Sequence, residues 1–197
     1  MRQLIITFLT LTVFFSCTSQ TEKTDYDPKA IELNNKAGEY YQIGEYDSAL
    51  YYFDKAIELD ENYYLPHSNK VNIYLSRKEY KKALNESELV LKKKPDLAEG
   101  WTFSGMLYDF WGDTIKAKSY YKKSIEIYDQ RISNPDKKQD LESNRLNKAF
   151  SLILIGKEKE GKEEFENLKS ENPDNIMIDE FLKINKQDYI RQIIGNE

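Results

Sequence analysis

The sequence is poor in the residues that carry most enzyme and metal chemistry. Its 197 residues include one cysteine, Cys17, and one histidine, His67. A single cysteine cannot form a disulfide within the chain, and these two residues offer too few groups for a metal site or a nucleophile and its base. We interpret His67 as a partly buried packing residue. The sequence therefore predicts no enzyme, no metal and no cofactor, and only a pair of carboxylates in one cleft would provide an alternative.

Residues that break helices are also scarce. The chain has 8 glycines and 5 prolines, while 40% of its residues are hydrophobic and 13% aromatic, which is enough for a core. This composition predicts an all-α fold. The formal net charge is −5, and lysine runs such as 92–94 lie among acidic residues. That pattern is typical of solvated helix faces and argues against nucleic-acid binding.

The first residues form the only long apolar run in the sequence. Arg2 is followed by the apolar stretch 4–15, which is typical of a secretory signal and shorter than the roughly 20 residues needed for a membrane-spanning helix. The segment from Phe14 to Cys17 then resembles the bacterial lipobox, although Phe14 and Phe15 depart from its usual residues. The resemblance implies removal of residues 1–16 and lipidation of Cys17. A plain secretory signal is the alternative.

The polar segment 17–29 has no helical periodicity, so we expect a flexible tether after the lipidated cysteine. By resemblance to bacterial lipoproteins, Thr18 after the cysteine favours the outer membrane over the inner one. The sequence thus predicts a lipid-anchored protein of the bacterial cell envelope, and it leaves the leaflet open.

A repeat of 34 residues organises the rest of the chain. Tyr40 recurs as Tyr74 and Tyr108, and Ala49 recurs as Ala83 and Ala117. Each unit contains two amphipathic stretches, with small residues where two antiparallel helices must approach closely. Such units bury their apolar faces only by stacking on one another.

The period and residue types resemble the tetratricopeptide repeat (TPR), most clearly from Trp101 through Gly105 and Tyr108 to Ala117 and Tyr121. The resemblance implies a right-handed superhelical stack of helix-turn-helix units, an α-solenoid, over residues 30–175. The expected units are 30–63, 64–97, 98–131 and a degenerate 142–175, with an insertion at 132–141.

The insertion and the C-terminal segment lie outside the regular repeats. Because residues 132–141 interrupt the period, we expect longer helices on either side and a projecting arm, which is either a second contact surface or a plain loop extension. Residues 176–197 are expected to form capping helices. Their apolar residues, Ile176 and Phe181 among them, would cover the last repeat, while Lys183 and Lys186 would face water.

In the tetratricopeptide family the first helix of each unit lines a concave groove. The resemblance therefore implies which positions of each first helix face this groove. Asn69 matches a carboxylate-binding pattern known in the family, but the expected lysines and arginine are missing, so we predict no carboxylate clamp. Each of these residues has packing between helices as its alternative role. The predicted groove residues are Asn34, Tyr41, Asn69, Asn72, Phe103, Met106, Asp109 and Phe110.

These features predict a non-enzymatic scaffold or adaptor that binds a protein or an extended peptide in the groove at the cell envelope. The alternative is a surface lipoprotein that captures a nutrient or glycan for a transporter. The sequence does not identify the partner or the oligomeric state.

Overall fold

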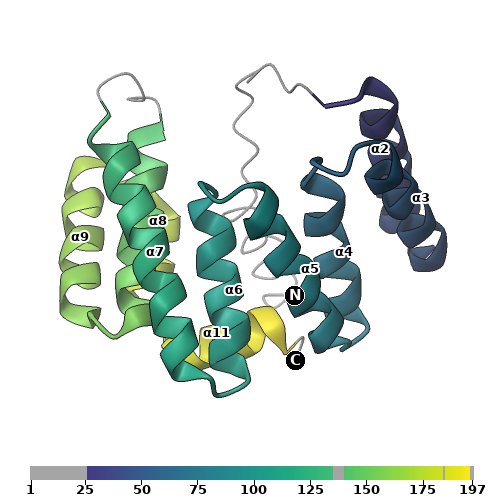
Figure 1. Ribbon diagram of the computed structural model, residues 1–197. Helices are drawn as coiled ribbons and strands as arrows, with labels where there is room; N and C mark the ends of the chain where they lie inside the picture. Colours follow the sequence, from purple (N-terminus) through teal and green to yellow (C-terminus); the bar gives the residue numbers. More distant parts are fainter. Residues whose placement is uncertain (1–25, 135–139, 184, 196–197) are drawn as a thin grey trace. The chain divides into compact units, whose positions relative to one another are not determined.

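The computed structural model describes residues 26–134, 140–183 and 185–195 (Figure 1). Within these residues the chain forms ten helices and no strand, so the predicted all-α class is confirmed. Cys17, the leader and most of the tether lie outside the described residues. The helices are α2 (Pro28–Gln42), α3 (Tyr46–Leu59), α4 (Leu65–Ser76), α5 (Tyr80–Lys93), α6 (Ala98–Phe110), α7 (Thr114–Ile132), α8 (Leu141–Ile155), α9 (Glu158–Glu171), α10 (Ile176–Lys183) and α11 (Lys186–Ile194).

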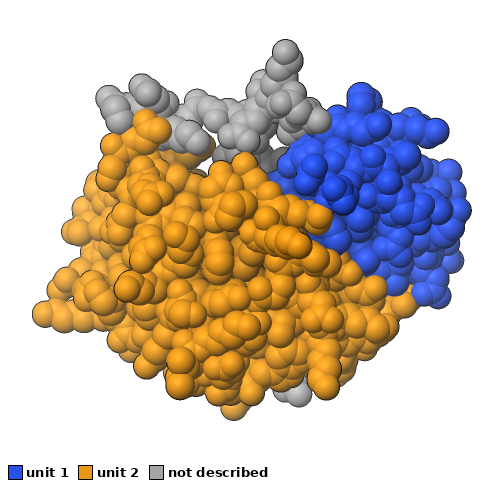
Figure 2. Space-filling view, in the orientation of Figure 1, with its two compact units in different colours: residues 1–73 blue, residues 74–197 orange. Residues whose placement is uncertain are grey.

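The chain divides into two compact units, residues 1–73 and 74–197 (Figure 2). The described part of unit 1 contains α2, α3 and the first residues of α4, and unit 2 contains the remaining helices. Each unit has its own core. In unit 1 the helices pack through Ala37, Ala49, Phe53 and Ile73, all of which are at most 1% exposed.

The first helix begins at Pro28, so residues 28 and 29 belong to α2 and the expectation of a tether that extends to residue 29 is wrong for them. Asp27 accepts a hydrogen bond from the Lys29 amide at 2.7 Å, and Pro28 occupies the first helical position. A side-chain cap satisfies one amide that has no partner inside the helix, and proline has no amide hydrogen to satisfy there. The boundary between the tether and the first helix is therefore encoded locally.

The turn between the two helices of each repeat has a residue in the left-handed conformation at position 15, counted from the first residue of the repeat (30, 64, 98 or 142). This residue is a glycine in three of the repeats, with φ between 79° and 100° at Gly44, Gly112 and Gly156. The second repeat has Lys78 at this position instead, with φ 56°. This conformation is strained for a residue with a Cβ atom. The common backbone requirement explains the glycines that the sequence places at these turns.

Close packing of α6 on α7 depends on the absence of a side chain at Gly105. A Cβ atom there would lie 2.6 Å from Cε1 of Tyr121, which is fully buried. The equivalent positions in unit 1 hold Ala37 and Phe53. A smaller residue on one helix thus accompanies a larger one on its partner, in keeping with close packing.

The insertion changes only one of its two neighbouring helices. α7 has 19 residues, against 14 in α3 and α5, and it ends at Ile132. α8 has 15 residues, the same as α2, so the expectation that both helices are extended is wrong for α8. Residues 135–139 lie outside the described residues, and the projecting arm stays a prediction.

The two C-terminal helices pack on different parts of unit 2. α10 packs on α9, with the Phe181 and Phe165 rings stacked at a centroid distance of 5.3 Å. α11, drawn in yellow, packs against α6 (Figure 1). Two expected orientations are wrong: Ile176 is 70% exposed, and Lys186 pairs with Asp109 rather than facing open water. α10 therefore covers the last repeat as predicted, and α11 contacts both α6 and, through Tyr189 and Phe150, the last repeat.

No helix in the described parts of the chain combines the length and apolar character needed to cross a bilayer.

Candidate functional site

The predicted groove residues of unit 1 bring amide side chains together. Nδ2 of Asn69 on α4 donates a hydrogen bond of 3.0 Å to Oδ1 of Asn34 on α2. Asn34 is buried, whereas Asn69 and Asn72 are half-buried. The pair fixes the orientation of both amides, so the exposed edge of Asn69 lies on a preorganised surface. Amides in this setting can donate to and accept from a peptide backbone.

Tyr41 lies toward the end of α2 in the same unit. Its ring is half-buried and lies 5.7 Å from the Tyr46 ring, and burial raises the pKa of its hydroxyl. The side chain therefore stays protonated and combines an apolar face with a polar end, which is typical of residues at binding surfaces. The next residue, Gln42, is exposed.

The predicted groove residues of unit 2 are largely covered. Met106 is fully buried, and the Asp109 side chain is only 3% exposed. Phe103 and Phe110 are half-buried, and the Phe110 ring lies 5.3 Å from that of Tyr80. The structure therefore differs from the prediction that these residues line an open groove, because the chain itself covers the inner face of α6.

Asp109 pairs with the helix that covers it. Nζ of Lys186 on α11 lies 2.6 Å from Oδ2 of Asp109, and the Tyr121 hydroxyl donates to the same oxygen at 3.1 Å. Burial, followed by the nearby carboxylate of Asp109, raises the pKa of the Tyr121 hydroxyl well above its ordinary value. The tyrosine therefore serves as a neutral donor, and the lysine supplies the charge that balances the buried carboxylate.

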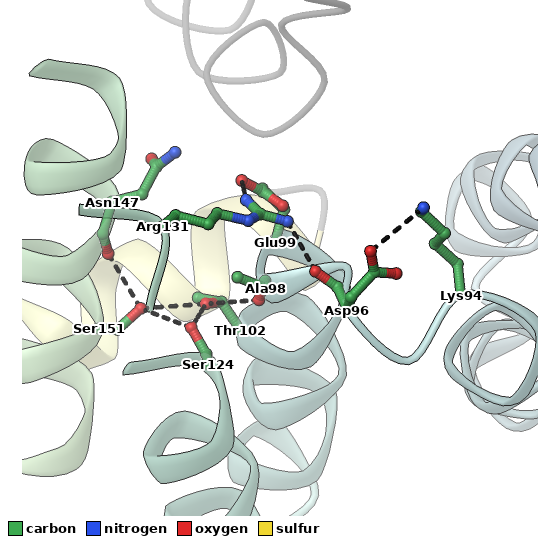
Figure 3. A network of polar contacts seen from close by, with 9 residues as sticks. All are labelled: Lys94, Asp96, Ala98, Glu99, Thr102, Ser124, Arg131, Asn147 and Ser151. Atoms are coloured by element: carbon green, nitrogen blue, oxygen red, sulfur yellow. Dashed lines mark hydrogen bonds and ion pairs between the residues drawn. The ribbon is translucent and has the colours of Figure 1, made fainter. Parts of the chain in front are cut away.

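Three buried hydroxyls join α6, α7 and α8 (Figure 3). Oγ1 of Thr102 lies 2.6 Å from Oγ of Ser124 and 3.0 Å from Oγ of Ser151, and the two serines are 3.2 Å apart. All three side chains are at most 1% exposed. The hydroxyls of Thr102 and Ser151 also each donate a hydrogen bond to a backbone carbonyl of their own helix. Thr102, an inner position in family geometry, is therefore structural and is not available to a ligand.

A second polar contact lies at the start of α6 (Figure 3). Arg131 near the end of α7 donates 2.8 Å to Oε1 of Glu99 and 2.7 Å to the Asp96 carbonyl. The guanidinium thus ties the extra turns of α7 to the start of α6. This role accounts for the charged pair without a ligand.

The remaining candidate groups also have structural roles or no site around them. His67 is 5% exposed on α4, in agreement with its interpretation as a packing residue. Across residues 26–134, 140–183 and 185–195, no group of three or more His, Cys, Asp or Glu side chains is placed to hold a metal ion. The arrangement offers amide, hydroxyl and aromatic contacts, which suit binding.

Sequence reasoning missed two residues that shape this site. Lys186 was placed on a solvated face because its partner, Asp109, is far away in the sequence, and no local signal connects them. Gly161 was also missed, although it follows Ala117 by the same 44 residues that separate Gly105 from Ala149. A Cβ atom at Gly161 would lie 2.6 Å from the Ala149 carbonyl, so the shifted repeat could have identified it as the helix contact of the fourth unit.

Two segments of the chain match family models described as tetratricopeptide repeat, residues 30–63 and residues 98–131. These segments contain α2 with α3 and α6 with α7. The resemblance to the tetratricopeptide repeat is therefore confirmed for these two segments, while the expected units 64–97 and 142–175 stay predictions.

The chain is also similar to part of a curated protein. The heat shock protein sti1 homolog of Schizosaccharomyces pombe is 34% identical over 97 residues, which cover 49% of this chain and 16% of that protein. The chain thus matches only about a sixth of the relative's length.

Solved structures share the fold at low sequence identity. A tetratricopeptide repeat protein from Parabacteroides merdae aligns with a TM-score of 0.56 and 21% identity, covering 88% of this chain and 62% of that one. YrrB, a TPR protein with an unusual peptide-binding site, aligns with a TM-score of 0.52 and 20% identity, covering 80% and 75%. These similarities confirm the predicted α-solenoid fold class.

Proposed function

We propose that this tetratricopeptide-repeat chain is a non-enzymatic scaffold that binds a protein or extended peptide segment through the inner face of unit 1. The proposed contact surface consists of Tyr41 and Gln42 on α2 with Asn69 and Asn72 on α4. Lipidation at Cys17 would hold this scaffold in the bacterial cell envelope, at the outer membrane rather than the inner one.

The observation that carries the proposal is the hydrogen bond between Asn34 and Asn69. It joins the buried amide of Asn34 in the first repeat to the half-buried amide of Asn69 in the second, and Tyr41 provides a half-buried ring on the same helix as Asn34. An extended peptide presents unpaired backbone amides and carbonyls, and preoriented side-chain amides bind them with little loss of side-chain entropy. Among solved structures of this fold, YrrB is itself described as having a peptide-binding site.

The surface also favours an uncharged contact. No lysine or arginine occupies the inner positions 34, 38, 41 and 42 of the first unit. A ligand held by its terminal carboxylate needs cationic donors at such positions. The expected ligand is therefore an internal segment of a partner, recognised through its backbone and one or two side chains.

The experiment that tests partner binding compares two double variants of the full chain. Asn69→Ala with Asn72→Ala removes the groove amides, whereas Asn85→Ala with Asn167→Ala removes two exposed amides from α5 and α9. We expect the groove variant to lose partner recovered by in-cell crosslinking by roughly tenfold, as loss of one or two buried hydrogen bonds would give. Equal recovery by both variants would refute the proposed surface.

The tether is tested separately. Two or three acyl chains on Cys17 would hold the protein stably at a bilayer, since each buried methylene contributes roughly 0.8 kcal/mol. We expect the wild-type chain to partition into detergent and membrane fractions and Cys17→Ser to be released. A Cys17→Ser protein that remains in the outer-membrane fraction would refute anchoring by lipid and leave the binding surface untouched.

A further inference from the structure

We propose that α11 is an internal ligand and that the inner face of α6 and α8 is a second binding site, which accepts an amphipathic helix with a lysine in its first turn. This site lies within unit 2 and does not depend on the function proposed for unit 1. In the described structure its occupant is the chain's own residues 186–194. An equivalent helix supplied in trans would compete with them.

α11 has the form of a helical ligand. Its buried residues, Tyr189, Ile190, Ile193 and Ile194, recur at the spacing of one helix face and are at most 8% exposed. Arg191 and Gln192 on the other face are exposed. The helix has nine residues, and a helix of this length is marginal in water by itself. Its order therefore comes from the surface that receives it.

The receiving surface is built from α6 and α8. The Tyr189 ring meets the Phe150 ring of α8 edge-to-face at 4.7 Å. At the other end of α11, a Cβ atom on Gly195 would lie 3.6 Å from Cε2 of Phe110 on α6. Aromatic side chains from two helices of the receiving surface therefore lie against the middle of α11 and beside the glycine that follows it.

The charge on this surface specifies the kind of helix that fits. Asp109 is almost completely buried, and a buried carboxylate needs a cation close to it. Lys186, in the first turn of α11, provides this cation, and its Nζ lies 2.6 Å from Oδ2 of Asp109. The same ammonium group lies 5.4 Å from the centre of the Tyr121 ring. The partial positive charge at a helix N-terminus adds to the attraction. A helix with a neutral or acidic residue at this position would leave Asp109 unbalanced.

α11 is not needed to close the end of the repeat stack, because α10 already does so. Phe181 stacks on Phe165 of α9, and Nζ of Lys169 lies 2.8 Å from Oδ2 of Asp179. Only residues 184 and 185 separate the two helices. Such a short connection gives α11 an effective concentration in the millimolar range, so a weak contact is occupied in cis.

The first test uses a fluorescein-labelled synthetic peptide of residues 185–197 and the full chain. In the release variant, Lys186→Glu with Ile193→Asp removes the cation and one buried residue of α11. The control, Lys183→Glu with Gln192→Asp, makes the same charge changes at exposed positions. By fluorescence anisotropy we expect the release variant to bind the peptide roughly tenfold more tightly than the wild-type or control chain does, because its site is vacated.

A second peptide, with Lys186→Glu, tests the role of Asp109. We expect it to bind the release variant at least roughly tenfold more weakly than the unmodified peptide does. Equal binding of the two peptides would overturn the specificity assigned to Asp109. A release variant that stays folded by circular dichroism and binds neither peptide would overturn the site itself.

Hydrogen exchange in the unmodified chain decides the matter even if the release variant unfolds. A detachable α11 opens without unfolding α6, so we expect amides 189–194 to exchange roughly tenfold faster than the buried amides of α6. Addition of excess unmodified peptide should speed their exchange further by capturing the opened site. A common exchange rate for α6 and α11, unaffected by peptide, would show that α11 is a permanent part of the core.

Discussion

The inner faces of the two units use equivalent repeat positions in opposite ways. In unit 1, position 12 is Tyr41 and position 13 is Gln42, and these side chains are half-buried and exposed. In unit 2 the same positions are Asp109 and Phe110, and α11 contributes Lys186 to Asp109 and lies beside Phe110. One repeat thus leaves these inner positions open, as the proposed contact surface requires, while the other packs against a segment of its own chain.

The comparison shows that a repeat position does not by itself define a binding site. Asn34 and Asn69 form a polar surface because each has an amide partner in unit 1. The inner face of unit 2 can hold the buried acidic side chain of Asp109 because a lysine from outside the repeats balances its charge. The residues added after the last repeat therefore determine which inner positions remain available.

The largest expected difference between the units is their sensitivity to alkaline pH. In unit 2, burial raises the pKa of the Tyr121, Tyr128 and Tyr189 hydroxyls, whereas in unit 1 burial raises the pKa of Tyr41 and a hydrogen bond from Lys36 lowers that of Tyr52. The unfolded chain releases these protons near pH 10 and folded unit 2 does not. Stability from the raised pKa values is therefore complete below pH 10 and is lost as pH rises above it, by about 1.4 kcal/mol per pH unit for each such tyrosine.

Tryptophan fluorescence measures this loss in unit 2 alone, because both tryptophans, Trp101 and Trp111, lie there. We expect urea midpoints to fall steeply between pH 10 and pH 11.5, with a smaller slope in Tyr189→Phe. An alkaline slope that is the same in the wild-type chain and in Tyr189→Phe would contradict the assignment of that buried hydroxyl.

The next largest effect concerns the helix contact at position 8. Gly105→Ala would place a Cβ atom against the Tyr121 ring, and we expect a loss of about 1–3 kcal/mol in the unfolding free energy of unit 2. Gly38→Ala is the matched change on the inner face of α2, where a Cβ atom would meet nothing within 4 Å. That variant should be neutral or more stable by roughly 0.5–1 kcal/mol.

Urea unfolding followed by far-ultraviolet circular dichroism and by tryptophan fluorescence would compare the two alanine variants. Similar stability losses in both would show that the close approach at Gly105 has no special importance.

The smallest predicted effect is a gain in stability at the turn of the second repeat. Lys78→Gly removes the strain of a left-handed lysine, and we expect about 0.5–1 kcal/mol of added stability after allowance for the freer unfolded chain. Gly112→Ala makes the reverse change at the same position of the third repeat and should destabilise it. Thermal unfolding of both variants checks the pair; a lower melting temperature for Lys78→Gly would contradict the role of position 15.

The sequence contained most of the repeat geometry because that geometry depends on local spacing. Ala37, Ala49 and Phe53 mark where α2 and α3 approach, and the glycines at position 15 mark the turns. The same reasoning placed Met106 and Asp109 on an inner face but did not show what covers them. The apolar side of α11 predicts that the helix packs, yet many surfaces of the stack could receive it.

Two features illustrate where local reasoning ends. Lys186 has the sequence surroundings of a solvated lysine, and only the fold brings it to Asp109. Likewise, nothing in the sequence around Thr102 indicates that its hydroxyl joins Ser124 and Ser151 inside the stack. In both cases the partner lies on another helix, and the sequence contains no spacing that connects them.

Site-specific photocrosslinking at position 13 of the first and third repeats tests which inner face binds a partner and which binds α11. A photoreactive amino acid replaces Gln42 in one full-length chain and Phe110 in another, and both are activated in cells. We expect an adduct between residue 42 and another protein, and an internal adduct between residue 110 and the peptide that contains Gly195. Crosslinking of residue 110 to the other protein, with none from residue 42, would show that the partner binds unit 2 instead of unit 1.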